Sequence, residues 1–157
     1  GKWGFVDKGG WMVMEPRFEA AERFSEGRAR VELGGRDGFV DKSGVLIVNT
    51  KYEKADSFSG GLAAVQTGGK FGFIDGDDKM VIGPRFDSAQ SFVEELATVS
   101  DGGEWRFINK SGEFVGLPFR GYTVWLGSRL GGLGYTKIGE TWWYVNREGR
   151  ILRQAPD

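Results

Sequence analysis

Asp75-Gly76-Asp77-Asp78 is the one local cluster of carboxylates in the chain, and such a cluster is a candidate for Ca²⁺ binding. An EF-hand loop needs a longer series of alternating acidic residues and a closing Glu to supply its six to eight oxygens. The cluster also falls where another segment has Asp-Lys-Ser-Gly, at Asp41–Gly44. An irregular turn is therefore the favoured interpretation, and neither a metal nor a cofactor is predicted.

The chain contains no Cys and no His. This composition excludes disulfides, thiol nucleophiles, soft-metal sites and catalytic triads built on His. Carboxylate pairs such as Glu94-Glu95 have the residue type for acid–base catalysis, but nothing in the sequence places two carboxylates on opposite sides of a pocket. We therefore predict that the chain is not an enzyme and that these residues lie in solvated turns.

Charged residues recur at a fixed spacing on either side of an aromatic residue. The cations are Arg17, Lys51 and Arg85, and the carboxylates two residues further on are Glu19, Glu53 and Asp87. If the segments stack, these residues form parallel ladders of opposite charge along one face. Two interpretations stay open: a solvated salt-bridge ladder that contributes little per pair, and an electrostatic docking stripe for a partner.

Overall charge and hydropathy narrow the choice of partners. The formal net charge of −1 argues against a broad nucleic-acid surface, which requires an excess of Lys and Arg. No run of about 18 apolar residues is present, so no membrane span is predicted. The chain begins with Gly1 at a repeat boundary without an initiator Met, which fits a fragment. The cellular compartment, cytoplasmic or exported, is therefore left open.

The sequence repeats with a period of 34 residues, which is most visible in Phe5, Phe39, Phe73 and Phe107. A period of this size indicates small structural units that cannot bury a core without their neighbours. Most of the 27 glycines fall at fixed places in the period, as turn residues. The predicted units are 1–35, 36–69, 70–103, 104–139 and a partial capping unit, 140–157. We predict that they form a single array over residues 1–157.

Each unit predicts about three short antiparallel strands. The first is an alternating run such as Trp3–Asp7, and a turn that opens with Asp or Asn and closes with Gly joins it to the second. The second strand, such as Trp11–Met14, is expected to end at Pro16. The third strand is a run such as Ala29–Leu33. No window shows sustained helical periodicity, so the fold class is all-β.

Stacking is required for stability, because ordering one 34-residue unit costs on the order of 50 kcal/mol. The repeated aromatic residues are expected to pack between neighbouring units. Both ends of the chain carry the same hairpin, at residues 1–14 and 140–152, and the final half-unit fits a cap. An open stacked β-repeat array is therefore favoured, and the alternative is a small closed array like a β-propeller.

The segment Gly1–Lys8 (Gly-Lys-Trp-Gly-Phe-Val-Asp-Lys), followed by Phe24-Ser25-Glu26-Gly27, resembles the bacterial WG repeat, also called the KWG repeat. The resemblance covers nearly the whole chain in about four and a half copies. It departs from the pattern at Arg36-Asp37, where Lys-Trp is expected. The resemblance implies a non-enzymatic β-repeat module that mediates interactions, including in secreted and toxin-associated proteins.

Residues that break the period are candidates for binding, because core positions follow the repeat. Trp, Tyr and Arg are the side chains most enriched at interface hot spots. With the periodic cations Arg17, Lys51 and Arg85, the candidate binding residues are Trp11, Tyr122, Trp125, Arg129 and Trp143. The alternative for the C-terminal members of this set is that they seal the end of the stack.

The predicted function is a protein–protein interaction or scaffolding module, with another protein as partner. One form of it is a binder that neutralises a toxin. The alternative is carbohydrate or cell-wall binding, because residues 142–149 resemble the aromatic hairpins of choline-binding repeats, whose rings cage cations and sugars.

Overall fold

The computed structural model describes residues 1–119, 123–125, 133–138, 140–146 and 150–154. Within these ranges all regular structure is β, and no helix is present that is long and apolar enough to cross a membrane. The chain divides into two compact units, residues 1–84 and 85–157. The prediction of one array over 1–157 therefore stays a prediction, and each unit is described by itself.

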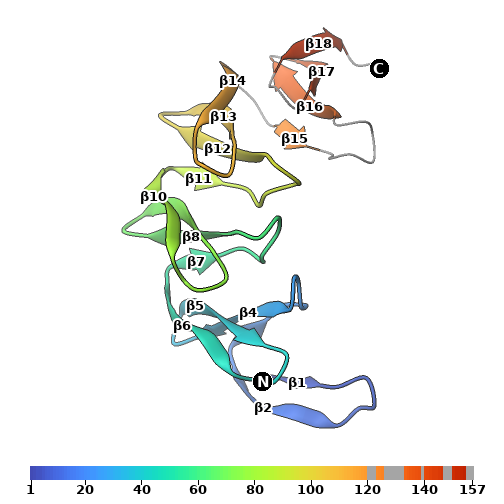
Figure 1. Ribbon diagram of the computed structural model, residues 1–157, viewed down its shortest axis with the longest axis vertical. Helices are drawn as coiled ribbons and strands as arrows, with labels where there is room; N and C mark the ends of the chain where they lie inside the picture. Colours follow the sequence, from blue (N-terminus) through green and yellow to red (C-terminus); the bar gives the residue numbers. More distant parts are fainter. Residues whose placement is uncertain (120–122, 126–132, 139, 147–149, 155–157) are drawn as a thin grey trace. The chain divides into compact units, whose positions relative to one another are not determined.

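The strands are grouped in small antiparallel sheets, shown in Figure 1. A two-stranded sheet contains β1 (Trp3–Val6) and β2 (Met12–Phe18). The next is β3 (Ala20–Ala21), β4 (Arg28–Leu33), β5 (Arg36–Asp41) and β6 (Leu46–Tyr52), followed by β7 (Lys54–Ala55), β8 (Ala63–Thr67), β9 (Lys70–Ile74) and β10 (Met80–Phe86). The last two are β11 (Ser88–Ala89), β12 (Ala97–Asp101), β13 (Glu104–Ile108) and β14 (Phe114–Phe119), then β15 (Thr123–Trp125), β16 (Leu133–Ile138), β17 (Thr141–Asn146) and β18 (Ile151–Gln154).

Each four-stranded sheet joins two sequence repeats. In the first of them, β3 and β4 come from the repeat 1–35, whereas β5 and β6 come from the repeat 36–69. The three predicted strands of each repeat are present in residues 1–103, and a strand of only two residues, such as β3, is added to them. Within the described ranges the sheets are separate and none closes into a barrel, which fits the open repeat array better than a closed propeller.

The sequence predicted that the second strand of a repeat ends at its proline, and this prediction is wrong. Strand β2 continues through Pro16 to Phe18, and β10 continues through Pro84. In the β1–β2 pair, Trp3 lies opposite Phe18 while Phe5 lies opposite Met14, so three residues of β2 bulge opposite Gly4. Proline is tolerated there because a bulge on an edge strand does not need its N–H for the ladder.

The bulge also explains the glycine at the centre of the first strand of a repeat. A Cβ added to Gly38 would lie 2.5 Å from the carbonyl oxygen of Val48 and 2.8 Å from the amide nitrogen of Thr50. Both atoms belong to the backbone of the neighbouring strand β6, which comes this close only because residue 38 has no side chain. The glycines at positions 4 and 72 have the same environment.

The predicted turn chemistry is confirmed in the hairpin between the first two strands of each repeat. The Asp41 carboxylate accepts hydrogen bonds from the amides of Ser43 (2.9 Å) and Val45 (3.0 Å). The equivalent residues Asp7, Asp75 and Asn109 accept the same pair of bonds in their own turns. Gly44 closes the turn with φ of 89°, a conformation that favours glycine.

The core lies between consecutive repeats, as the period predicted. One cluster joins Met14 and Val31 of the first repeat to Val40 of the second. A second cluster joins Phe39 and Phe58 of the second repeat to Ile74 of the third. Residues 85–157 have a cluster of their own, which contains Leu96, Phe107 and Val145. Full burial of one such side chain contributes roughly 1.5–3 kcal/mol.

Within residues 1–84, several residues that depart from the 34-residue repeat contact one another. Tyr52 stands where neighbouring repeats have Phe18 and Phe86, and Asp78 stands where they have Gly44 and Gly112. The Tyr52 hydroxyl donates a 2.6 Å hydrogen bond to Asp78, and Lys51 pairs with the same carboxylate at 2.5 Å. Asp78 adopts φ of 62° at this position, so its contact with Tyr52 and Lys51 offsets a conformation that disfavours side chains.

Arg28 and Gly76 form another such pair. Arg28 replaces the Leu of the next two repeats, and Gly76 replaces the Lys found at positions 8, 42 and 110. The guanidinium lies 4.9 Å from the centre of the Phe58 ring and reaches the Gly76 carbonyl at 3.5 Å. A Cβ at residue 76 would lie 2.0 Å from Nη2 of Arg28. These two exceptions to the repeat therefore also contact each other.

A double-mutant cycle tests the contact between Tyr52 and Asp78. We expect Tyr52→Phe alone to lower the free energy of unfolding by about 1.5 kcal/mol, because it removes a hydrogen bond to a charged group. In the background of Asp78→Gly the same change should cost much less, since the acceptor is gone. Denaturant titrations of the four proteins measure the coupling. Equal costs in both backgrounds would show that the two residues do not act together.

Candidate binding surface

The first repeat has an exposed face whose counterparts in the next repeat are covered. Phe24 is 36% exposed and its counterpart Phe58 is 1% exposed, while Val6 is exposed and its counterpart Val40 is buried. Phe5 packs on Phe24 with ring centroids 5.1 Å apart, the same pair that Phe39 and Phe58 form at 4.8 Å. We call Trp3, Phe5, Val6 and Phe24 the end face of the first repeat.

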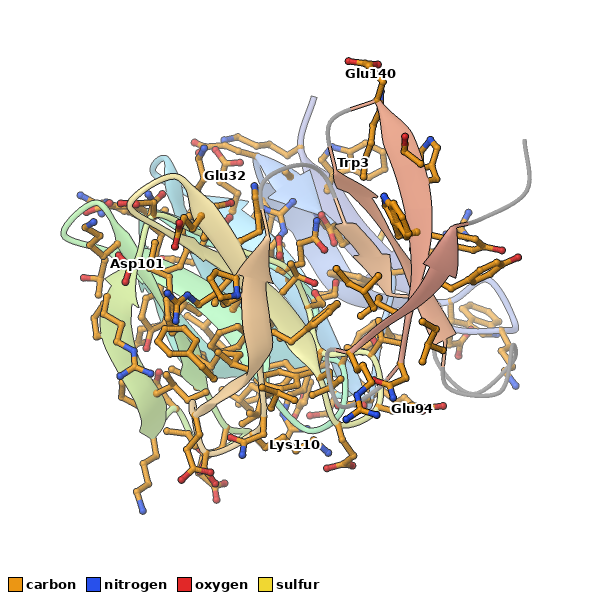
Figure 2. The ribbon with its side chains drawn as sticks, turned by 90° about the horizontal axis from the view of Figure 1, so that it is seen from above. Trp3, Glu32, Glu94, Asp101, Lys110 and Glu140 are labelled. Atoms are coloured by element: carbon orange, nitrogen blue, oxygen red, sulfur yellow. The ribbon has the colours of Figure 1, made fainter. Side chains whose placement is uncertain are left out.

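A groove of about 950 Å³ runs along the end face. Its apolar wall is the end face itself, and Glu22, Arg23, Ser25 and Ser57 add polar groups. Trp3, labelled in Figure 2, is 58% exposed at the groove. Binding sites commonly combine an apolar wall with a few polar groups in this way.

Trp11, predicted from the sequence as a binding residue, lies at the adjoining β1–β2 hairpin and is 78% exposed. Its amide donates to Asp7 of the hairpin turn, so the backbone that carries the indole is held in place. Met12 and Val13, which follow it on β2, are exposed as well. Exposed apolar groups gathered on one element distinguish a contact surface from single scattered ones.

The three predicted cations each lie over the ring of the following aromatic residue. Arg17 is 4.9 Å from the centre of the Phe18 ring, and Lys51 and Arg85 are at 5.1 and 4.8 Å from Tyr52 and Phe86. Lys51 also binds Asp78, and Arg85 donates to the carbonyl of Gly112. Lys51 and Arg85 are thus engaged with the turn of the next repeat, so they hold repeats together.

The carboxylates two residues further on bind the turn between repeats. Glu19 accepts a 3.0 Å hydrogen bond from the amide of Gly35, and Glu53 accepts bonds from Gly68 and Gly69 at 2.9 and 3.0 Å. The Gly35 amide bond, together with Lys2, lowers the pKa of Glu19 from its ordinary value. Their ion pairs are formed with Lys2 and Arg36. The predicted ladder of opposite charges therefore consists of hydrogen bonds from carboxylates to turn amides and of separate ion pairs.

The other sequence-predicted residues lie near the C-terminus. Tyr122 and Arg129 fall outside the described residues, and Trp125 belongs to β15 but its side chain lies outside the description too. Trp143 is half-buried on β17, and its neighbour Trp142 is 40% exposed. A binding role for Tyr122, Trp125, Arg129 and Trp143 stays a prediction.

Sequence reasoning missed a cluster of charges centred on Arg30. Its guanidinium binds Asp37 at 2.7 Å and Glu22 at 2.6 Å. Asp37 is buried and also accepts a 2.7 Å hydrogen bond from the amide of Ala55, and Ser57 donates to Glu22. The available signal was the departure from Lys-Trp at Arg36-Asp37, because a charge in place of an aromatic residue requires a counter-charge where it is buried.

Asp56 lies beside this cluster, and its ionisation is disfavoured. Burial, with a contribution from the negative charge of Glu22, raises the pKa of Asp56 above 3.8. Because the folded-state pKa exceeds the unfolded one, this carboxylate destabilises the fold above its folded pKa and has no effect below the unfolded pKa. We expect Asp56→Asn to raise the thermal midpoint at pH 7 and to lose this advantage as the pH falls toward 3.8. A gain in the thermal midpoint of Asp56→Asn that persists unchanged at acid pH would contradict this account of Asp56.

The acidic cluster Asp75–Asp78 forms the same hairpin turn as its counterparts in the other repeats, and not the irregular turn that the sequence predicted. Asp75 accepts amide hydrogen bonds from Asp77 and Lys79, and Asp78 binds Tyr52 and Lys51. Among the described residues no group of three His, Cys, Asp or Glu side chains is arranged to hold a metal ion.

Comparison with known proteins agrees with the repeat architecture. The family model described as WG containing repeat matches residues 3–36, 38–71 and 71–105, well over half of the chain. Among solved structures, the crystal structure of hemopexin fold protein CP4 from cow pea is similar, with 14% sequence identity, 90% of this chain and 94% of that chain covered, and a TM-score of 0.38. At that score the similarity carries no argument. No curated protein matches the chain.

Proposed function

The chain belongs to the WG containing repeat family, and from that premise we propose that it is a non-catalytic module that binds another protein through its first repeat. The observation that carries the proposal is the end face, which is open in the first repeat and covered in the second. Trp3 offers a large, exposed aromatic ring at an apolar groove with a few polar groups, and Trp11 offers a second exposed ring on the β1–β2 hairpin. This is the composition typical of a binding hot spot with a polar rim.

Trp11→Ser tests this proposal with a matched control. Val45 occupies the equivalent position of the second repeat and is 57% exposed, so Val45→Ser removes an exposed apolar side chain at the same repeat position from a surface that we do not assign to binding. The immobilised chain and both variants are exposed to extract of the source organism, and the bound proteins are quantified. We expect Trp11→Ser to weaken binding of the principal partner about 30-fold, the effect of losing a hot spot of about 2 kcal/mol.

The outcome for the control decides the interpretation. Val45→Ser should retain the partner at the level of the unmodified chain. If Trp11→Ser and Val45→Ser capture it equally well, the first repeat is not the binding surface.

The identity of the bound molecule distinguishes two narrower functions, toxin neutralisation and glycan binding. Neutralisation of a toxin, one form of the protein-binding proposal, requires that the captured protein be a toxin and that the chain suppress its activity. Glycan or cell-wall binding is the alternative, and it rests on the aromatic residues of β17. Tryptophan fluorescence titrations with choline, glucans and peptidoglycan fragments test it, and a saturable change lost in Trp142→Ser would favour it over the protein partner.

A further inference from the structure

Aspartate followed by glycine is prone to rearrangement of the backbone, and the chain contains this dipeptide three times. The pairs are Asp37-Gly38, Asp75-Gly76 and Asp101-Gly102. Glycine has no Cβ to shield its backbone nitrogen, so that nitrogen can attack the carboxyl group of the preceding aspartate. The surroundings of the three pairs differ, and the fold therefore decides which of them reacts.

The side chain of Asp37 is held through both of its oxygens. Arg30 donates to Oδ1 at 2.7 Å, and the amide of Ala55 donates to Oδ2 at 2.7 Å. Asp37 is also buried in strand β5. Rearrangement at this pair would first have to break a buried ion pair, which is strongly disfavoured.

The side chain of Asp75 is held by its own hairpin turn. Its Oδ1 accepts hydrogen bonds of 3.0 Å from the amides of Asp77 and Lys79. The space next to Gly76 is also filled, since a Cβ there would overlap the guanidinium of Arg28. Attack on the Asp75 carboxyl would therefore cost two hydrogen bonds in a crowded turn.

Asp101 has neither kind of restraint. It is exposed at the end of β12, where Gly102 and Gly103 form the loop of the hairpin to β13. Among the described residues, no hydrogen bond or ion pair reaches its carboxylate. It also departs from the repeat, because Leu33 and Thr67 occupy its position in the two preceding repeats. The third repeat therefore places a carboxyl group before a glycine where the first two do not.

A proton acceptor already contacts the attacking nitrogen of this pair. The amide of Gly102 donates a 2.8 Å hydrogen bond to Oδ2 of Asp87, a distance at which a carboxylate can act as a general base. The space around Gly102 is open, since a Cβ there would meet no atom within 4 Å. Glu53 binds the equivalent Gly68 in the second repeat, but the residue before that glycine is Thr67.

We propose that Asp101 is a site of spontaneous isoaspartate formation, with Asp87 as the proton acceptor. The nitrogen of Gly102 attacks Cγ of the protonated Asp101 carboxyl group. The amide proton passes through Asp87 to the departing hydroxyl, which leaves as water, and the product is a five-membered succinimide ring. Water then adds to the main-chain carbonyl carbon of the ring and breaks its bond to nitrogen. The main chain then runs through Cβ and Cγ of residue 101, and the former main-chain carbonyl becomes a free carboxylate.

The rearrangement lengthens the backbone by one carbon in a two-residue hairpin loop. Asp101 lies opposite Glu104, and the loop residues Gly102 and Gly103 have φ of 58° and 81°. Loops of this length fix the register of the strands that they join. We therefore expect the modification to displace the Gly102 amide from Asp87 and to loosen this end of the β12–β13 hairpin.

Peptide mapping of the aged full chain tests the proposal. The chain is kept at about 37 °C and pH 7 and sampled over several weeks. Trypsin then places each Asp-Gly pair in a separate peptide, residues 37–42, 71–79 and 86–106. Electron-transfer fragmentation locates the isoaspartate and quantifies it. We expect it to form at Asp101 at least about tenfold faster than at the other two pairs, because their hydrogen bonds must break first.

Two matched controls separate the effect of the fold from that of the sequence. In guanidinium chloride the chain is unfolded, so the rates at the three pairs should become similar. In the folded chain, Asp87→Asn keeps the shape of the side chain and removes the proton acceptor. We expect this variant to form isoaspartate at Asp101 at least about tenfold more slowly, with unchanged rates at the other two pairs.

Selective modification of Asp101 that disappears on unfolding supports the proposal. Equal rates at the three pairs of the folded chain, or isoaspartate at Asp87 instead of Asp101 within the peptide 86–106, would overturn it. Selectivity that persists in guanidinium chloride would overturn it as well, because the sequence alone would then explain the difference. An unchanged or faster rate in Asp87→Asn would show that Asp87 is not the proton acceptor.

Discussion

Replacing Gly38 with alanine is expected to lower the free energy of unfolding by about 3 kcal/mol, the upper range for overpacking. The added Cβ would lie 2.5 Å from the Val48 carbonyl oxygen and 2.8 Å from the Thr50 amide nitrogen, and neither backbone atom can rotate away as a side chain does. Strand β6 would have to move, and it carries Val48 and Tyr52 into the core. Chemical denaturation followed by tryptophan fluorescence measures the loss.

Gly83 provides the control for this experiment. It lies in strand β10, and a Cβ there would meet no atom within 4 Å. Gly83→Ala should therefore change stability by less than about 0.5 kcal/mol. Similar losses for the two variants would show that the close approach of the strands is not the reason for the glycine at position 38.

The second large effect is expected at Asp37. Asp37→Ala should cost about 3 kcal/mol, because it leaves Arg30, whose side chain is only 18% exposed, with Glu22 as its remaining partner and removes the acceptor of the Ala55 amide. The cost lies at the lower end for a broken buried pair, since the contact with Glu22 persists. Thermal and urea unfolding at pH 7 both report it.

Restoring the regular residues of the repeat should reverse this loss. In the next repeat the positions of Arg30 and Asp37 are occupied by Ala64 and Phe71. The double variant Arg30→Ala with Asp37→Phe removes both charges together, and replacing a buried ion pair by apolar residues is often neutral or stabilising. We expect its stability to lie within about 1 kcal/mol of the unmodified chain. A double variant less stable than Asp37→Ala would contradict this account of the cluster.

The periodic part of the structure could be predicted from sequence because it depends on local pattern. Phe39 and Phe73 recur at strand positions that the pleat turns inward, Phe58 recurs just before a turn, and all three are buried. The Asp that opens each hairpin turn acts on amides two and four residues away, as at Asp41. Such short-range chemistry is visible in one repeat and is confirmed by its recurrence.

The contacts between period-breaking residues could not be predicted, because they join positions far apart in the chain. Tyr52 and Asp78 are separated by 26 residues, and Arg28 and Gly76 by 48. A single sequence shows each as an isolated exception and does not show that they meet. The assignment of strands to sheets was hidden for a related reason, since each four-stranded sheet begins in one repeat and ends in the next.

These contacts also sharpen the choice of candidate binding residues. Lys51 and Arg85 follow the period and bind neighbouring turns, and Tyr52 and Asp78 break the period and bind each other. Departure from the repeat is therefore not sufficient to indicate a binding role. What distinguishes Trp3 and Trp11 is that they are large, aromatic and exposed, and Trp3 also lines a groove.

Hydrogen exchange of the chain in complex with its captured partner, compared with the free chain, tests the central claim most directly. The proposed surface predicts slower amide exchange in residues 3–14 and 21–25, which contain the end face, the residues that line the groove and the β1–β2 hairpin. Exchange in residues 88–119 should be unchanged. Protection confined to residues 88–119, with none in the first repeat, would contradict the claim that the first repeat binds the partner.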